Sequence, residues 1–332
     1  MQQFFFQNPK YFSSLFKKLL AALYITWVSS HTVSANTVIK RAKIYKIRNQ
    51  VDLNFDRNSD WQQAVTGDVI VPKDSVRTGV NSRADILFNE GSLVRTGAST
   101  TFRFPPGKRS FELTSGAALI MIRPDQGSST INTPEAKVVS QGTALFVQHD
   151  PESNSSLVGV LTNSPAGLVE VSSADGSITL QLQAGQFVSI VQGVVGLVEH
   201  FVLPMFYETV ELAAGLGMNP EELEAMLSQE SPEVQATIRA VQAEVTDPLQ
   251  NQLAWLQGFC KLRIERENMA TLLQLLGVRR SSLNPNLEIT ETDLSLIPFR
   301  SLDGITWLGE YCQESQTLPG LEPDNLPPQN SK

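Results

Sequence analysis

The chain has 332 residues, of which 41% are hydrophobic and 18% charged. This balance is typical of folded globular proteins, and the length is enough for about two domains. The formal net charge is −8, but residues 36–202 are neutral overall, whereas residues 203–332 carry a net charge of −11. A uniformly basic surface is therefore excluded, and we expect no nucleic-acid partner.

The first 35 residues have the features of a targeting segment. Lys10, Lys17 and Lys18 form a positive flank, followed by the apolar run Leu19–Val28 and the small-residue pattern Val33-Ser34-Ala35. This run of ten residues would span about 15 Å as a helix, half of the hydrocarbon core of a membrane. We therefore predict a signal peptide over residues 1–35 and a periplasmic or otherwise exported protein. An uncleaved anchor that holds the protein at the inner membrane, facing the periplasm, is the alternative.

Residues 40–198 are expected to form a mainly β domain. Short strand-like runs alternate with turn sequences rich in Gly, Pro and Asn, and this punctuation favours a β-sandwich or a β-solenoid-like fold over alternating strands and helices. The predicted strands are Lys43–Arg48, Ala84–Phe88, Leu93–Thr96, Thr100–Phe104, Ala117–Ile122, Val138–Val147 and Leu157–Leu161. A hairpin is predicted where Leu168–Ser172 turns through Asp175-Gly176 into Ile178–Leu182, because Asp-Gly suits a tight turn.

Residues 201–280 are predicted to be α-helical. Asn219-Pro220 and Ser231-Pro232 are helix starts, since Asn and Ser can cap and Pro fits the first helical position. A third helical stretch is expected from Leu249 to Leu276. The apolar stripes on these segments predict packing surfaces, and they consist of Leu223, Met226 and Leu227, then Val234, Ile238, Val241 and Val245. Residues 281–316 look irregular, and residues 317–332, with four prolines after residue 317, look disordered.

The chain has two cysteines, Cys260 and Cys312. In an oxidising compartment they could form a disulfide that stabilises the fold by about 4 kcal/mol. Two separate buried thiols are the alternative.

A cluster of basic residues is conspicuous between residues 73 and 123. It exceeds the acidic residues of the same stretch by four, and it consists of Lys73, Arg77, Arg83, Arg95, Arg103, Lys108, Arg109 and Arg123. These side chains could face an anionic envelope polymer or the acidic C-terminal half of the same chain. Scattered, solvated charges on strand faces are the simpler interpretation.

Several stretches in order along residues 45–190 resemble the FecR domain, an all-β periplasmic module of transmembrane regulators and exported bacterial proteins. They are Trp61 with Ala64, Gly67-Asp68, Thr78-Gly79, Ser82–Phe88, Glu90-Gly91-Ser92, Gly116, Thr133-Pro134, Gly142-Thr143, Gly167–Val171 and Ala184-Gly185-Gln186. The glycines fall at the ends of strand-like runs, where turns need positive φ angles. The signature is therefore interpreted as a requirement of folding, and the ligand-binding residues stay unknown.

Three departures from the family are informative. Glu90 stands where the family usually has Asp, and Leu145 follows Gly142-Thr143-Ala144 where the family has Phe. About 18 residues precede the apolar run, which is too short for a folded sigma-binding domain. The anti-sigma role is therefore not inferred from the resemblance.

No catalytic motif is found in the sequence. His149, next to Asp150 and Pro151, is expected in a surface turn, and no nucleophile is placed near it. Acidic and amide residues at every second position from Asp52 to Asp60 are similar to a calcium loop, but the required Gly and Glu positions hold Arg57 and Gln63. We therefore expect no enzyme activity, no cofactor and no metal.

The sequence as a whole predicts a non-enzymatic exported FecR-domain protein that acts as an interaction or binding module of the cell envelope. Its partner would be a protein or an envelope polymer. The alternative function is that of a membrane-anchored regulatory or signal-transduction protein of the FecR type that lacks a sigma-binding domain.

Overall fold

The computed structural model describes residues 38–56, 60–107 and 109–275, with side chains as far as Gln257. All of these residues lie in one compact unit. The predicted signal peptide, the irregular segment 281–316 and the tail 317–332 lie outside the described residues.

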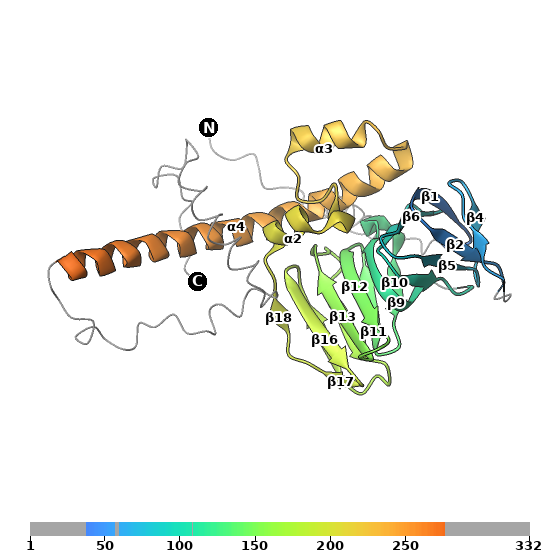
Figure 1. Ribbon diagram of the computed structural model, residues 1–332, viewed down its shortest axis with the longest axis horizontal. Coiled ribbons are helices and arrows are strands. Elements are labelled where there is room, and N and C mark those ends of the chain that lie inside the picture. Colours follow the sequence, from blue (N-terminus) through green and yellow to red (C-terminus); the bar gives the residue numbers. More distant parts are fainter. Residues whose placement is uncertain (1–37, 57–59, 108, 276–332) are drawn as a thin grey trace, which may run out of the picture. The chain divides into compact units, whose positions relative to one another are not determined.

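Two β-sheets make up the first part of this unit (Figure 1). Sheet A has the order β4–β1–β6–β7–β9–β12–β13–β16, with β17 and β18 both paired to β16. Its strands are β4 (Val69–Ile70), β1 (Ala42–Arg48), β6 (Arg83–Phe88), β7 (Leu93–Thr96), β9 (Ser110–Met121), β12 (Ala144–Asp150), β13 (Ser155–Val160), β16 (Gln186–Val191), β17 (Val194–Val195) and β18 (Glu199–His200). All of its pairs are antiparallel, and several of them join strands that are far apart in the chain, such as β1 with β6 and β13 with β16.

Sheet B has the order β3–β2–β5–β8–β9–β10–β11–β14–β15. Its further strands are β3 (Gln62–Gln63), β2 (Val51–Asn54), β5 (Ser75–Thr78), β8 (Thr101–Arg103), β10 (Ser128–Asn132), β11 (Ala136–Gln141), β14 (Val169–Ser173) and β15 (Thr179–Leu182). The pair β9–β10 is parallel. The predicted hairpin is confirmed as the antiparallel pair β14–β15.

Strand β9 belongs to both sheets. Its first half pairs with β8 and β10 in sheet B, and its second half pairs with β7 and β12 in sheet A. The change of sheet occurs at Gly116, whose φ is +81°. A Cβ there would lie 2.4 Å from Oγ1 and 2.5 Å from Cα of Thr100. Only glycine therefore permits this corner.

The main hydrophobic core lies between the two sheets. Alternate residues of each strand point into it, as expected for a sandwich. At its centre Phe88 contacts Phe104 and Phe111 edge to face, with ring centroids 5.2 and 5.1 Å apart, and Phe102 completes the cluster. Of the two predicted architectures, the structure is the sandwich.

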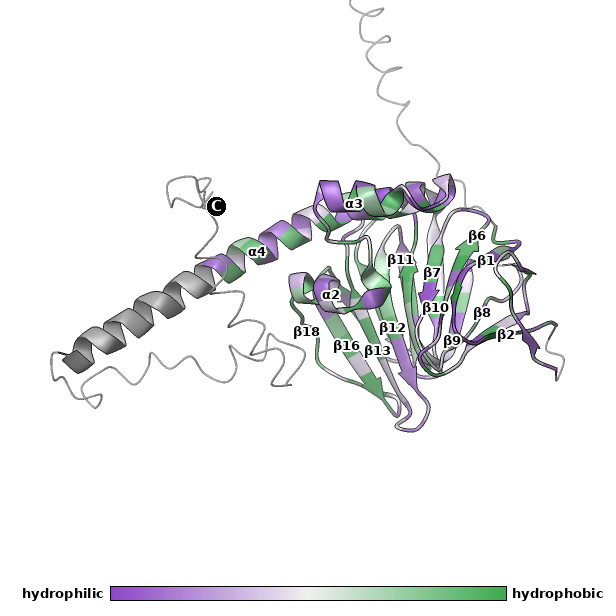
Figure 2. Ribbon diagram, turned by 45° about the horizontal axis from the view of Figure 1, so that its top comes forward, coloured by the Kyte–Doolittle hydropathy of each residue, from purple (hydrophilic) through white to green (hydrophobic). Residues whose placement is uncertain are grey.

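A second core covers the outer face of sheet A. Along β9, Ile120 points into the sandwich, whereas Leu119 and Met121 point outward to the helices. These are α2 (Leu203–Thr209), the 3-10 helix η2 (Glu211–Ala213), α3 (Pro220–Leu227) and α4 (Pro232–Leu275). In Figure 2, α2, α3 and the first turns of α4 lie along the sheet, and α4 then continues beyond it. Both faces of sheet A are thus buried around the second half of β9, which explains the unbroken apolar run Ala117–Ile122.

The predicted helical stripes are confirmed, with one correction to the helix count. Val234, Ile238, Val241 and Val245 of α4 are all buried in the second core, as are Leu223 and Leu227 of α3. The third helix predicted from Leu249 is not separate, because α4 continues through Pro248. Proline removes one backbone hydrogen bond, and the surrounding helix tolerates that loss. Within the described residues, no helix combines the length and apolarity that crossing a membrane requires.

Candidate interaction site

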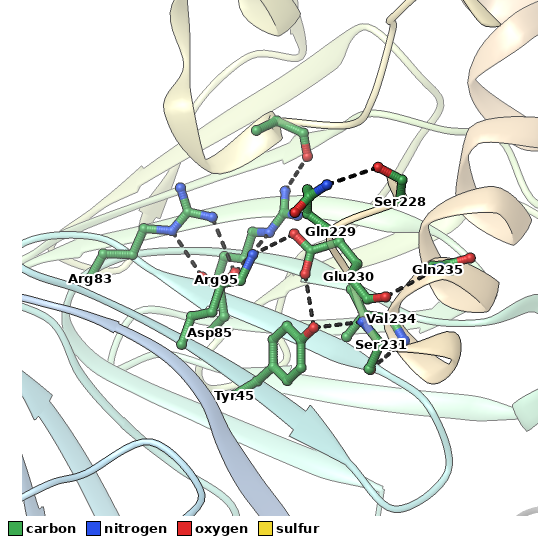
Figure 3. Close-up of polar contacts among 12 residues, drawn as sticks. Tyr45, Arg83, Asp85, Arg95, Ser228, Gln229, Glu230, Ser231, Val234 and Gln235 are labelled. Atoms are coloured by element: carbon green, nitrogen blue, oxygen red, sulfur yellow. Dashed lines mark hydrogen bonds and ion pairs between the residues drawn. The ribbon is translucent and has the colours of Figure 1, made fainter. Parts of the chain in front are cut away.

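A cluster of charged side chains is buried between sheet A and the helices. Arg83 and Asp85 project from the outer face of β6, and Arg95 projects from the paired position on β7. Arg83 binds Asp85 with two hydrogen bonds of 2.9 and 3.3 Å, and Nε of Arg95 lies 3.5 Å from the same carboxylate (Figure 3). Arg95 is only 3% exposed, and burial lowers its pKa, while the charge of Asp85 opposes that effect. Asp85 therefore pairs with both guanidinium groups and offsets part of their positive charge in a buried interface.

The two arginines hold the segment that follows α2. Arg95 donates to the backbone oxygens of Leu212, at 2.9 Å, and of Ala214. Arg83 donates to the backbone oxygen of Glu211 at 3.1 Å. The oxygens of Leu212 and Ala214 lie at the C-terminal end of η2, where backbone oxygens lack helical partners, whereas the oxygen of Glu211 also accepts the N–H of Ala214. Guanidinium groups therefore cap η2 and fix it to the sheet.

A β-bulge fixes the start of α4. The pairing of β1 with β6 shifts register between Ile44 and Lys46, so the consecutive residues Tyr45 and Lys46 both lie on the outer face, toward the helices. Its hydroxyl donates to Oε2 of Glu230 at 2.9 Å and accepts from the backbone N–H of Ser231 at 2.7 Å. Lys46 pairs with the same Glu230 (Figure 3 shows the Tyr45, Glu230 and Ser231 contacts). The first turn of α4 is thereby held over β1.

A groove of about 930 Å³ lies where β1, the β6–β7 turn and the first turn of α4 meet. Its lining combines apolar and polar side chains, including Val69, Leu87, Asn89, Gln126 and Pro232. It is called the junction groove below. Because strands and α4 both contribute to it, the groove exists only when the helical segment is docked on sheet A.

Charge in the junction groove is mostly positive. Arg41 and Lys43 line it, are exposed, and have no acidic partner among the residues that the structure describes. Glu90 also lines it, but both Glu90 and Arg109 are buried, and they form an ion pair of 3.1 Å. Glu233 contributes one exposed carboxylate at the start of α4. The two unpaired cations therefore favour an anionic group in the groove.

The turn between β6 and β7 shapes one wall of the groove. Gly91 has a φ of +94°, and a Cβ there would lie 2.8 Å from Cδ of Arg123. Oε2 of Glu90 accepts the N–H of Ser92 at 2.8 Å and closes the turn. The other oxygen of the same carboxylate pairs with Arg109.

The predicted basic cluster is dispersed by the fold. Arg83 and Arg95 contact the C-terminal half of the chain, which was one of the three interpretations of this cluster. Arg77 lies over the ring of Trp61, 4.2 Å from its centroid, and Arg103 pairs with Glu112. Lys108 lies outside the described residues. These arginines therefore stabilise the fold, and they do not form one anion-binding surface.

The FecR-like signature positions are spread over many turns. Gly67, Gly91, Gly142 and Gly185 have positive φ angles, and the other positions are Asp68, Thr78, Gly79, Ser92, Thr133, Pro134 and Thr143. Of the whole set, Gly67 and Gly91 line the junction groove. Gly79 differs from the expectation because its φ is not positive; a Cβ there would lie 3.3 Å from Gln50 and Ser82. The close approach of these side chains, rather than backbone strain, accounts for glycine at this position.

His149 is not in a surface turn, contrary to the prediction. It lies on β12, is 2% exposed, and its Nδ1 is 3.0 Å from Oγ of Ser156. Ser156 in turn bonds Oγ1 of Thr133 at 2.7 Å. Burial lowers the pKa of His149, and the nearby charge of Glu135 opposes that effect. This buried chain of three side chains ties the β10–β11 turn to sheet A, and the alternation of β12 buries His149.

Two further sequence predictions concern cysteines and metals. Cys260 is on α4 and Cys312 lies outside the described residues, so the disulfide stays a prediction. Among the described residues, no group of three or more His, Cys, Asp or Glu side chains gathers as a metal site would require. Asp52, in the calcium-like series, pairs with Arg77 at 3.1 Å.

Sequence reasoning missed Tyr45, Arg41 and Lys43. The strand that carries Lys43 and Tyr45 was predicted from Lys43, Arg41 directly precedes it, and the bulge that brings Lys46 beside Tyr45 has no sequence signal. The groove also depends on a helix almost two hundred residues further along the chain. No local pattern brings these residues together.

The structure is a β-sandwich whose sheet A is covered on its outer face by helices. A groove lies where sheet A meets the first turn of α4. Residues 74–164 match the family described as FecR protein. The chain therefore contains a FecR domain, within the wider stretch where the resemblance was seen. No protein with curated function matches the chain in sequence.

Two solved structures, both of candidate anti-sigma factors from Parabacteroides distasonis ATCC 8503, are similar to part of the chain. The first is 19% identical with a TM-score of 0.33, and the match covers 38% of this chain and 59% of that one. The second is 16% identical with a TM-score of 0.33, covering 46% of this chain and 88% of that one. Neither likeness assigns a function to this chain.

Proposed function

We propose that this chain is an exported, non-enzymatic FecR-domain protein that binds a partner of the cell envelope in the junction groove. The observation that carries the proposal is the exposure of Arg41 and Lys43 on the groove, with no acidic partner among the described residues. Unpaired cations on a concave surface attract an anionic partner and orient it.

The lining of the groove favours a protein segment as the partner. Val69 is 53% exposed, and Leu87 and Pro232 add apolar surface beside the two cations. An apolar floor with a polar rim is typical of sites that bind side chains of a polypeptide. A polymer that carries only charged and hydroxyl groups would leave the apolar floor without a contact. We therefore infer a segment with both acidic and apolar residues.

Charge reversal in the groove tests this proposal. Immobilised full-length protein is used to capture partners from solubilised envelope fractions, with Lys43→Glu as the test variant. Lys137→Glu on β11 is the matched control, because Lys137 is also exposed and lies on sheet B. We expect Lys43→Glu to reduce the captured partner at least tenfold, corresponding to about 1.4 kcal/mol, and Lys137→Glu to leave it unchanged.

Protease treatment of the envelope fraction before capture identifies the class of partner. A protein partner disappears after this treatment, whereas an envelope polymer is still captured. Equal capture by wild type and Lys43→Glu, or capture that survives protease, would count against the proposal.

A further inference from the structure

Strand β15 forms the free edge of sheet B. Among the described residues it pairs with β14 and with no other strand. Edge strands of this kind offer a row of backbone N–H and C=O groups to another chain, and proteins usually block them with a charge, a proline or a bulge. Strand β15, Thr-Leu-Gln-Leu, has none of these.

The pairing with β14 determines which backbone groups are free. The N–H of Ser173 bonds the oxygen of Ile178 at 3.1 Å, so Ser173 and Ile178 are a hydrogen-bonded pair. Antiparallel pairs alternate, and Leu180 and Leu182 therefore direct their backbone groups toward β14. The N–H and C=O groups of Thr179 and Gln181 point away from it, to the open edge.

Apolar side chains also become more exposed along this edge strand toward the hairpin turn. Leu182 is buried, Leu180 is half-buried and Ile178 is 45% exposed, although all three belong to the same face. No Asp, Glu, Lys or Arg occurs from Gly176 to Val198. The edge therefore lacks both a hydrogen-bonding partner and the charges that would repel one.

We propose that a second copy of this chain adds its β15 antiparallel to this strand and joins two sheets B into one. A two-fold axis at Leu180 places Thr179 opposite the partner subunit's Gln181, and Gln181 opposite the partner subunit's Thr179. All of the outward backbone groups of these residues are then paired. The same register places Leu180 against the partner subunit's Leu180, and Ile178 against the partner subunit's Leu182.

A second copy fits this edge electrostatically, although the whole chain is acidic. The nearest acid on the neighbouring strand is Glu170, which is paired with Gln181. In the dimer the two Glu170 side chains would be three strand spacings apart, about 14 Å. This exceeds the screening length of about 8 Å at physiological ionic strength. Repulsion between the carboxylates of the two copies is therefore weak at this edge. In this register the strand is complementary to itself, so a second copy can pair all of its outward backbone groups.

Sedimentation analysis of the full-length chain tests the dimer with Gln181→Pro. Because the N–H of Gln181 points away from β14, proline there blocks the free edge and leaves the β14–β15 ladder intact. We expect a dimeric wild type, a monomeric Gln181→Pro and, as a control that keeps the N–H, a dimeric Gln181→Thr. A wild type that is monomeric at every concentration overturns the proposal, as does a Gln181→Pro that remains dimeric.

Cross-linking provides a second test that does not depend on the folding of the proline variant. Leu180 and its symmetry mate would form a non-hydrogen-bonded pair with Cα atoms about 4.5 Å apart, within the range for a disulfide. We expect Leu180→Cys to give a disulfide-linked dimer on mild oxidation, with peptide mapping that joins the two substituted positions. A dimer linked only through Cys260 or Cys312 contradicts the proposed register. Binding in the junction groove is independent of this edge, so either proposal can fail alone.

Discussion

Individual buried polar residues couple the stability of this fold to pH, and His149 is the main example. Burial lowers its pKa below the ordinary value of 6.5, while its ring bonds Ser156. Below about pH 6.5 the unfolded chain binds a proton that the folded chain does not. The free energy of unfolding therefore falls as the pH drops through 6.5 toward the folded pKa.

A substitution at this position isolates the effect. We expect His149→Gln to remove the loss of stability that the wild type shows between about pH 7.5 and 5.5, a loss of up to about 1.4 kcal/mol per pH unit. Melting temperatures across this range give the measurement, and His200→Gln, at an exposed histidine, is the control. The prediction fails if wild type and His149→Gln lose stability in parallel.

Among the secondary-structure elements, β9 depends most on one residue because it crosses between the sheets at Gly116. Gly116→Ala would add a Cβ within 2.5 Å of Thr100, on a backbone with a φ of +81°. We expect this variant to lose about 3 kcal/mol or more. Gly107→Ala is a matched control, because its φ of +77° is similar and nothing lies within 4 Å of the added Cβ. It should cost about 1 kcal/mol.

Chemical denaturation of both variants measures this difference. Equal losses would mean that backbone strain alone explains Gly116, and that the crowding against Thr100 has little effect. A larger loss at Gly116 would confirm that the corner of β9 is where the two sheets are joined.

The same elements show how far sequence reasoning reaches. The hairpin of β14 and β15 was predictable because alternation and an Asp-Gly turn are local signals, and the α4 stripe through Val245 was predictable from its spacing. Strands of two residues, such as β3 and β4, are too short to show a period. Pro248 predicts a break in a helix, but α4 continues through it. The bulge at Tyr45 interrupts the in–out alternation of β1, so a period of two does not predict it.

The candidate site was less predictable than the fold. The excess of basic residues between 73 and 123 was visible, and docking on the C-terminal segment was among its interpretations. Which arginines dock was not visible, because Arg83 and Arg95 act largely through backbone oxygens of residues 211–214, with one ion pair from Arg83 to Glu211. Arg41 and Lys43 showed no signal, since their importance comes from lacking partners in the folded chain.

At the scale of the whole molecule, the FecR domain and the helical segment form one structure. Arg95 is central to their contact, because it bridges Asp85 and the backbone oxygens of Leu212 and Ala214. Replacing it with Met would leave those oxygens without their donor in a buried interface. We expect a loss on the order of 3 kcal/mol. Arg239→Met, which breaks an exposed pair with Glu224, should leave the melting temperature unchanged.

Hydrogen exchange of the full-length wild type, Arg95→Met and Arg239→Met tests the docking of the helical segment most directly. In the wild type and Arg239→Met, we predict that amides of α2 and of residues 234–245 exchange as slowly as those of β7 and β9. In Arg95→Met, those helical amides should exchange faster than the strands. Rapid exchange of the helical amides in the wild type, with the strands still protected, would contradict the docked structure and the junction groove that depends on it.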